Sequence, residues 1–182
     1  MAYEDQNNPA SEILQEFEHL KSNRSAWEGQ WNQIAEMVIP RRADFHNRDR
    51  NPGNERRQKI FDSTPVRALT RFSAGMHNIL TPAAAPWFIL KPRVRALEQN
   101  RNVSLWLEET TRQVQGFLSR PQSNFHPAVY EYYADLGAFG TAIMFVEDVP
   151  GEGPLFRNFP LSDCILATDN FGRIDTVFRQ HK

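Results

Sequence analysis

The sequence predicts an α+β protein in which several helices precede a small antiparallel β meander. Up to residue 140, apolar residues recur at spacings of three, four and seven, which are typical of helix faces. Beyond it, short β-branched or aromatic runs alternate with the turn sequences PGEG and DNFG. We therefore expect N-terminal helices packed on a C-terminal meander: a helix with a basic arm in residues 1–60, a central helical region in 61–140, and the meander in 141–182.

The composition is ordinary for one globular core, with 40% hydrophobic and 24% charged residues over 182 positions. The single cysteine, Cys164, excludes an intrachain disulfide and a cysteine-built zinc site, and we expect it to be a small buried residue. The opening residues, MAYEDQNNPASE, lack the basic start and apolar run of a secretory signal. These features predict a protein that is made and kept in the cytosol.

The first helix is predicted between Pro9 and Val38. Its apolar face is expected to carry Ile13, Phe17, Leu20, Trp27, Trp31, Ile34 and Val38. Asn8 supplies a side-chain acceptor for the helix start, and Pro9 is preorganised for the first helical position. At the other end Pro40 disfavours helical geometry at Ile39, so the helix is expected to stop there.

Charge is distributed unevenly along the chain, although the net charge is only −1. Residues 1–40 have a net charge of −5, residues 41–59 and 60–101 each have +4, and residues 102–182 have −4. Residues 41–59 lack apolar periodicity and contain a Pro52-Gly53 turn, so we expect an exposed basic arm there.

The arm supplies the candidate partner-contact or DNA-contact residues, which are Arg41, Arg42, Arg48, Arg50, Arg56, Arg57 and Lys59. Clustered basic residues hold phosphate groups or the acidic surface of a neighbouring protein. A solvated arm without a partner is the alternative. Only Phe45 interrupts the charges, so the arm lacks the aromatic platform of a single-strand binder.

The second helix is predicted from Thr64, with Pro65 in its first turn, to Leu80. Its apolar positions keep helical spacing, and the small residues between them let neighbouring elements approach closely. The small residues are Ala68, Ser73, Ala74 and Gly75. We therefore expect a central helix surrounded by other elements.

Residues 72–90 contain no Lys, Arg, Asp or Glu, and this length approaches that of a membrane span. Pro82 and Pro86 exclude one continuous helix, because each removes a backbone donor and clashes with the preceding turn. We expect the second helix to end there and a short strand to follow in WFIL, residues 87–90. Four tryptophans lie on apolar faces and are predicted core anchors: Trp27, Trp31, Trp87 and Trp106.

A third helix is predicted from Val103 to Leu118, and a fourth follows SNFHP. Asn124 or His126 is expected to cap the fourth helix, and Gly137 and Gly140 to end it. The strands are expected in TAIMFVED, PLFRNFP, DCILATD and RIDTVFRQ.

The sequence lacks the motifs of common active sites. No Gly is followed by Lys, and neither G-x-G-x-x-G nor G-x-S-x-G occurs. The five histidines have no metal-ligand spacing, and the paired carboxylates Glu108-Glu109 and Glu147-Asp148 point apart on a helix or strand. We therefore expect no enzyme and no catalytic, cofactor or metal site. An enzyme with an unrecognised site and a small DNA-binding protein that uses the basic arm remain alternatives.

The chain resembles the head-to-tail connector, or portal protein, family of short-tailed bacteriophages. The resemblance lies in motifs that occur in a fairly specific order along most of the chain. They are Trp27 and Trp31 leading to Ile39-Pro40, FDST at 61–64, LTP at 80–82 followed by WF and Leu90, Trp106-Leu107, SNF at 123–125, Phe139-Gly140-Thr141-Ala142, and the strand pair around Asp169, Gly172 and Asp175.

The resemblance implies the wing region of a ring, commonly of about twelve copies, at one capsid vertex of the virion. Double-stranded DNA is packaged and ejected through such a ring, which implies partners among capsid, scaffolding, tail adaptor and terminase proteins. It also implies synthesis in the host cytoplasm, no membrane span and no catalysis. A ring needs a heterologous interface, for which the alternating charged segments offer complementarity.

The last strand predicts that further sequence follows Lys182. Ile174, Val177 and Phe178 reach almost to that residue, and no later element covers the meander, which we therefore expect to be incomplete. Family members are longer and build their stem and clip from later sequence, so the resemblance assigns no tunnel contact to these residues. We expect residues 1–182 alone to fold loosely and to form no ring.

Overall fold

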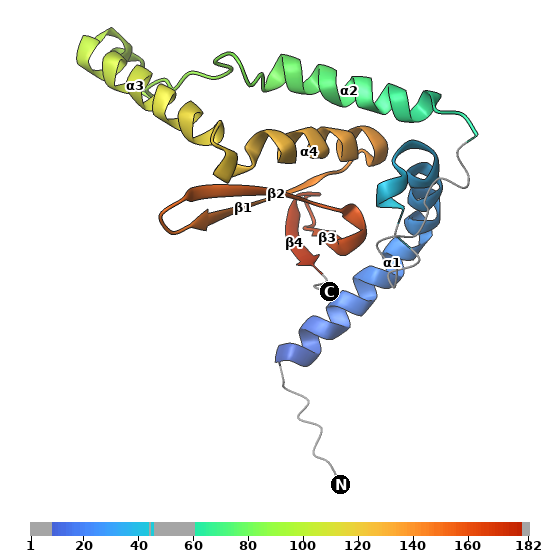
Figure 1. The fold of residues 1–182 in the computed structure, drawn as a ribbon. Coiled ribbons are helices and arrows are strands. Elements are labelled where there is room, and N and C mark those ends of the chain that lie inside the picture. The colour runs from blue at the N-terminus through green and yellow to red at the C-terminus, as the bar shows by residue number, and fades with distance from the viewer. Residues whose placement is uncertain (1–8, 44, 46–60, 180–182) are drawn as a thin grey trace. The chain divides into compact units, whose positions relative to one another are not determined.

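The computed structural model describes residues 9–43, 45 and 61–179 (Figure 1). Within this part of the chain, four α-helices come first and four β-strands follow. The predicted α+β class is therefore confirmed. The contacts divide the chain into two compact units, a first unit of residues 1–66 and 160–182 and a second unit of residues 67–159.

The described residues of the first unit form one long helix and one hairpin. Helix α1 runs without interruption over Pro9–Val38, and the short 3₁₀ helix η1 follows at Pro40–Arg42. Both ends of α1 agree with the prediction from the two prolines, while Asn8 lies outside the described residues. The 3₁₀ helix η4, Leu161–Asp163, leads into the antiparallel pair of β3, Cys164–Thr168, and β4, Ile174–Arg179.

The turn of the β3–β4 hairpin is held by one carboxylate. Asp169 Oδ1 accepts hydrogen bonds from the backbone N–H groups of Phe171, at 2.9 Å, and Arg173, at 2.8 Å. Gly172 has a φ of 76°, which an L residue rarely adopts. The DNFG sequence therefore forms the predicted turn through an Asp acceptor and a left-handed glycine.

The second unit contains the remaining helices and a second hairpin. Most of α2, Thr64–Leu80, belongs to it, with α3, Arg101–Leu118, and α4, Phe125–Phe139. The 3₁₀ helices η2, Arg95–Gln99, and η3, Pro121–Ser123, precede α3 and α4. Strands β1, Ile143–Val149, and β2, Gly153–Phe159, pair antiparallel with Ile143 opposite Phe159 and Val149 opposite Gly153.

The four predicted strands all form, but within the described residues they pair as two separate hairpins. Pro160 and the 3₁₀ helix η4 lie between β2 and β3. Proline lacks the N–H that a sheet ladder needs, so β2 is not continued directly into a third neighbouring strand. The predicted meander is thus divided at this point.

The core of the second unit is aromatic and lies between α4 and the β1–β2 hairpin. Phe125, Val129 and Tyr133 on one face of α4 are buried, and partly buried apolar residues surround them. The surrounding residues are Met76, Leu118, Tyr132, Met144 and Phe156. A polar contact also links α4 to β2, because the buried carboxylate of Asp135 accepts a 2.6 Å hydrogen bond from the side-chain amide of Asn158.

The expected side-chain cap of α4 is not formed. Asn124 occupies the N-cap position with a φ of 52°, but its side-chain amide donates to the backbone carbonyl of Phe156 at 3.0 Å. The residue therefore ties the helix start to β2, since its side chain reaches across to the strand. Of the two glycines predicted to end the helix, Gly140 is confirmed because it follows the helix in the left-handed conformation, whereas Gly137 lies within the helix.

Helix α2 packs on α4 along one face only, so the prediction of a surrounded central helix is wrong. Ile79 is 78% exposed, and Phe72 and Leu80 are also exposed. The close approach comes from α4, where a Cβ on Gly137 would lie 2.7 Å from the Phe72 ring. Nothing lies within 4 Å of a Cβ on Gly75, so this small residue serves no close contact within the structure.

The predicted strand at WFIL is also wrong. These residues are extended but unpaired by any strand, and side chains of α3 satisfy their backbone instead. The Leu90 N–H donates to Thr111 Oγ1 at 3.1 Å, and the Phe88 carbonyl accepts from Gln115 Nε2 at 3.0 Å. The Trp87 ring stacks on Phe125 with centroids 5.8 Å apart.

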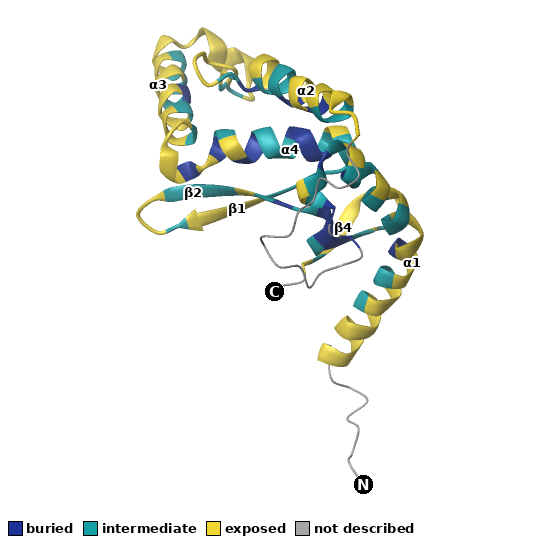
Figure 2. Cartoon of the chain, turned by 45° about the vertical axis from the view of Figure 1, so that its right-hand side comes forward, coloured by how far each residue is buried: buried dark blue, intermediate teal, exposed yellow. Residues whose placement is uncertain are grey.

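The tryptophans differ in how far they are buried, and Figure 2 shows exposed and partly buried positions on α1 and α3, which carry three of them. Trp27 is 58% exposed and Trp106 is 65% exposed, so the prediction of core anchors is wrong for both. Trp87 is also exposed, at 36%, although one side of its ring stacks on the buried Phe125. Trp31 is half-buried and contacts the buried Phe45 ring at 5.7 Å. The helical spacing of apolar residues predicts a buried face that is wider than the face that packs on other elements.

Candidate interaction surfaces

The structure describes only the beginning of the basic arm. Arg41 and Arg42 form the end of η1, where the first is exposed and the second half-buried, and each has an interaction partner. The other five candidates, Arg48, Arg50, Arg56, Arg57 and Lys59, lie outside the described residues. Their convergence on a partner therefore stays a prediction.

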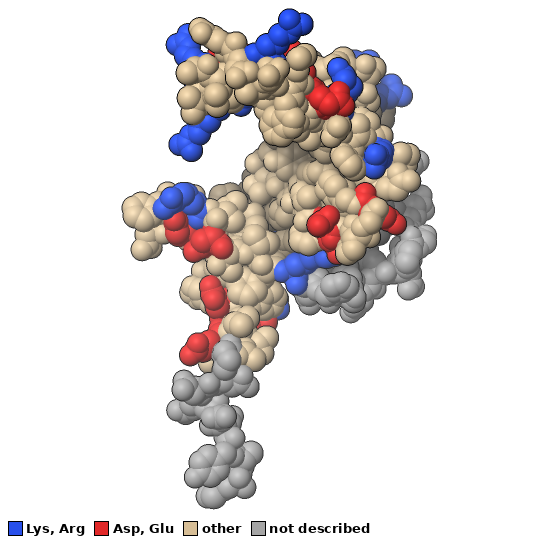
Figure 3. All heavy atoms as spheres, turned by 90° about the vertical axis from the view of Figure 1, so that its left-hand side faces the viewer, with Lys and Arg blue, Asp and Glu red and all other residues tan. Residues whose placement is uncertain are grey.

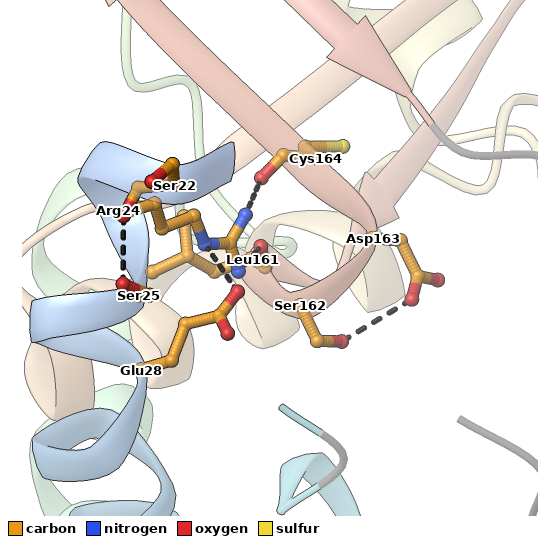
Figure 4. Close-up of polar contacts among 8 residues, drawn as sticks. All are labelled: Ser22, Arg24, Ser25, Glu28, Leu161, Ser162, Asp163 and Cys164. Carbon is orange, nitrogen blue, oxygen red and sulfur yellow. Dashed lines mark hydrogen bonds and ion pairs between the residues drawn. The ribbon is translucent and has the colours of Figure 1, made fainter. Parts of the chain in front are cut away.

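A buried arginine joins α1 to the β3–β4 hairpin in the first unit (Figure 4). The Arg24 guanidinium donates to the backbone carbonyls of Leu161, at 2.8 Å, and Cys164. Its Nε lies 3.2 Å from Glu28 Oε1. The guanidinium also lies over the rings of Trp31, at 5.3 Å, and Phe45, at 5.7 Å.

The sequence contains a signal that Arg24 is buried, and a search for apolar residues alone does not detect it. Phe17, Leu20, Arg24 and Trp31 follow the spacing of a single helix face, so the arginine occupies a position that an apolar residue would normally take. Arginine tolerates such a site because its planar group satisfies several acceptors at once and stacks on aromatic rings. A charged residue at an apolar position of a helix face therefore indicates a buried polar contact.

The neighbouring Cys164 is 1% exposed, as predicted for a small buried residue. Burial raises the pKa of its thiol, and the nearby Asp163 carboxylate raises it further. A thiol in this environment stays protonated and has little nucleophilic character.

Two histidines that are far apart in the sequence meet in the second unit. His77 Nε2 on α2 lies 3.2 Å from His126 Nδ1 on α4, and the rings meet edge to face. Burial lowers the pKa of His126, and the charge of His77 lowers it further. The sequence-based view of scattered histidines missed this pair, because only the packing of α2 on α4 brings them together.

The described residues contain no group of three or more His, Cys, Asp or Glu side chains suited to a metal ion. One carboxylate of each sequence pair is engaged in an ion pair, since Glu109 binds Arg112 and Glu147 lies 3.2 Å from Arg157. In the same part of the chain, the helices are too short or too polar to cross a membrane.

The second unit exposes a surface that combines apolar and basic residues. We call it the connection surface and define it by the exposed residues Ile89, Lys91, Arg93, Val94, Arg95, Leu97, Arg101, Leu105 and Trp106. It covers the connection after α2 and the start of α3. Figure 3 shows several Lys and Arg side chains projecting from the upper part of the molecule, where Figure 1 draws these elements.

The β1–β2 hairpin exposes apolar and acidic residues near its turn. We call this the hairpin surface and define it by the exposed residues Phe145, Val146, Glu147, Asp148 and Glu152. The ion pair with Arg157 engages one of its three carboxylates. Two carboxylates are left to give the surface its negative charge.

Comparison with known proteins assigns the chain to a family. Residues 10–182 match the family described as bacteriophage head to tail connecting protein. The chain is 32% identical over 168 residues to a probable portal protein of Bordetella phage BPP-1 and 30% identical over 168 residues to the portal protein of Salmonella phage epsilon15. Each of these alignments covers 92% of the chain and 30% of the relative.

The matched region includes nearly all of both units, and the similarity extends from α1 to the last strand. The chain spans about a third of the length of these two relatives. The resemblance noted in the Trp27-to-Asp175 motifs is therefore confirmed at the level of the family, and the chain belongs to the bacteriophage head-to-tail connecting proteins.

Proposed function

We propose that the intact gene product is a phage portal subunit. It forms a ring of about twelve copies at one capsid vertex, through which double-stranded DNA is packaged and ejected. Capsid, scaffolding, tail adaptor and terminase proteins are its partners, and its place is the virion after synthesis in the host cytoplasm. The observation that carries this proposal is the continuous family match over residues 10–182, which two relatives named as portal proteins support.

The role proposed for the chain is structural and not catalytic. Its sequence has no phosphate-binding motif, which fits a system in which a separate terminase hydrolyses ATP. The family assignment gives no support to the alternative of a small DNA-binding regulator. The near-neutral net charge of −1 also differs from the strongly basic balance that is usual for such regulators.

The experiment that tests the portal function is a measurement of assembly on the intact gene product. Electron microscopy should reveal closed rings, and a mass measurement in solution should give about twelve subunits. Monomers alone at micromolar concentration, with no rings in the images, would contradict the proposal.

The basic arm is proposed to bind a neighbouring subunit, another virion protein or DNA through Arg41, Arg42, Arg48, Arg50, Arg56, Arg57 and Lys59. Changing Arg41, Arg42, Arg56 and Arg57 to Ala should weaken assembly or packaging in a salt-dependent way while the subunit stays folded, since such contacts are electrostatic. Unchanged assembly and packaging would instead favour a solvated arm.

A further inference from the structure

The connection surface carries charge that its own subunit does not neutralise. Within residues 89–106 the four basic residues are accompanied by one acid, Glu98, which leaves an excess of three positive charges. None of the four takes part in an ion pair or a side-chain hydrogen bond with the described part of the chain. Trp106 is 65% exposed. Trp and Arg are among the residue types that contribute most to binding energy at protein interfaces.

The hairpin surface has the opposite charge and a similar apolar share. Asp148 and Glu152 have no ion pair among the described residues, and Val146 is exposed on the face of β1 that carries Asp148, while Phe145 is exposed on the opposite face. The strand register sets Val146 and Asp148 on alternate positions of β1, so an apolar and an acidic side chain share one face. The hairpin surface therefore complements the connection surface in charge, and both surfaces expose apolar residues.

The far end of the connection surface cannot pair with the hairpin surface of the same subunit, because α3 separates the two. The C-terminal end of α3 lies at the hairpin, where the Phe117 ring is 3.9 Å from the Cβ position of Gly153. Arg101 lies at the other end of the helix, 16 residues from Phe117, which corresponds to roughly 24 Å at 1.5 Å per residue. Figure 1 shows the N-terminal end of α3 pointing away from the hairpin. Ion pairs require atoms within about 4 Å, and none joins the two surfaces within the described part of the chain, so their charges are available to a second molecule.

We infer that the connection surface of one copy docks on the hairpin surface of a second copy. This inference rests on the proposed portal function, because a ring of identical subunits needs two different and complementary surfaces on every copy. Charge complementarity favours a second copy as the occupant, since the chain itself carries the acidic surface that matches its basic one. The exposed apolar residues supply the area that excludes water, and the charges fix the orientation.

Charge reversal on each side tests the contact in the intact gene product. The first variant combines Arg93→Glu with Arg95→Glu, so both of its surfaces are acidic. The second combines Asp148→Lys with Glu152→Lys, so both of its surfaces are basic. In either variant alone every contact joins like charges, whereas in an equal mixture each contact between unlike copies joins opposite charges.

We expect each variant alone to form at least about tenfold less ring than the natural protein, because like charges facing each other at an interface cost several kcal/mol. The equal mixture should regain rings in which the two variants alternate. Native mass spectrometry of the mixture, with one variant isotopically labelled, should find equal numbers of the two variants in each ring. Circular dichroism should give both variants the natural fold, since surface charges contribute little to stability.

Two matched controls reverse exposed charges elsewhere. Arg67→Glu with Arg71→Glu on α2, and Glu12→Lys with Glu16→Lys on α1, should leave assembly unchanged. Normal assembly of either test variant alone would overturn the inferred contact, and so would failure of the mixture or equal damage by the controls. Rings of the natural protein in those cases would leave the portal function intact, whereas their absence would overturn both proposals.

Discussion

The two units join helix to hairpin by different means. In the first unit the contact between α1 and β3 centres on a charged side chain, Arg24, whose guanidinium donates to two backbone carbonyls. In the second unit the contact between α4 and β2 centres on aromatic rings, with Phe125 and Phe156 meeting edge to face at 5.0 Å. A guanidinium bonds in fixed directions, whereas an apolar contact depends chiefly on the area that it removes from water.

This difference predicts unequal tolerance to substitution. Removing a buried donor leaves its acceptors without partners, and the loss cannot be regained by local repacking. An apolar core loses less when the replacement keeps most of the volume. The first unit should therefore depend on one residue far more than the second unit does.

The largest expected effect is that of Arg24→Ala. The substitution leaves Glu28 and the carbonyls of Leu161 and Cys164 without the guanidinium, so we expect the free energy of unfolding to fall by about 3–5 kcal/mol. Chemical denaturation measures the total loss, and hydrogen exchange should localise it to β3. Lys21→Ala is the matched control, because Lys21 belongs to an exposed ion pair with Glu18 and should contribute at most about 1 kcal/mol. Similar losses from the two variants would contradict a hub at Arg24.

Phe125→Leu in the second unit should have a smaller effect. Leucine keeps most of the buried apolar volume but loses the stacking on Trp87, so we expect a loss of about 1.5 kcal/mol. The same denaturation experiment checks this value. A loss as large as that of Arg24→Ala would remove the contrast between the two units, since it would mean that the aromatic core is equally intolerant.

The sequence predicted elements better than contacts. All four helices and four strands follow from apolar periodicity, from prolines such as Pro40, and from turn glycines such as Gly140 and Gly172. These signals are local, so a single sequence contains them. WFIL was assigned to a strand because short, bulky runs are common in strands, yet the side chains of Thr111 and Gln115 satisfy its backbone.

The candidate surfaces were harder to predict, because they depend on which side of each element is covered. Trp106 has the spacing of a core residue but lies on the outer side of α3, and only the packing of the unit decides this. The basic excess of residues 60–101 was visible in the sequence. The exposure of Trp106 beside these charges was not visible, since it depends on which side of α3 the rest of the unit covers.

A third prediction concerns the contact between α2 and α4, and it tests how closely these two helices are packed. Gly137→Ala places a methyl group against the Phe72 ring at 2.7 Å, and the ring must move. Alanine favours a helix by about 1 kcal/mol over glycine, while overpacking costs about 1–3 kcal/mol, so we expect a net loss of about 1 kcal/mol. Thermal unfolding measures the difference.

Two further variants isolate the cause of this loss. In a Phe72→Ala background Gly137→Ala should become stabilising, because the obstructing ring is gone and only the flexible end of the Leu69 side chain, at 3.0 Å, stays close. Gly116→Ala on α3 should stabilise by about 1 kcal/mol in the natural background, since nothing lies within 4 Å of its Cβ position. A stabilising Gly137→Ala in the natural background would show that the α2–α4 contact adapts freely.

The smallest expected effect concerns pH and the pair of His77 and His126. Because burial, and then the charge of His77, lower the pKa of His126, the unfolded chain takes up a proton more readily than the folded chain. The stabilisation is therefore complete above the ordinary pKa of 6.5 and is lost as the pH falls through that value toward the lower pKa of the folded state. Denaturation above and below pH 6.5 should reveal this decrease, and His126→Gln should make it shallower.

His19→Gln is the control, because His19 lies exposed on α1, 3.1 Å from the Asn23 side chain. An unchanged pH dependence in His126→Gln, or an equal change in the control, would mean that the histidine pair does not couple the α2–α4 contact to pH.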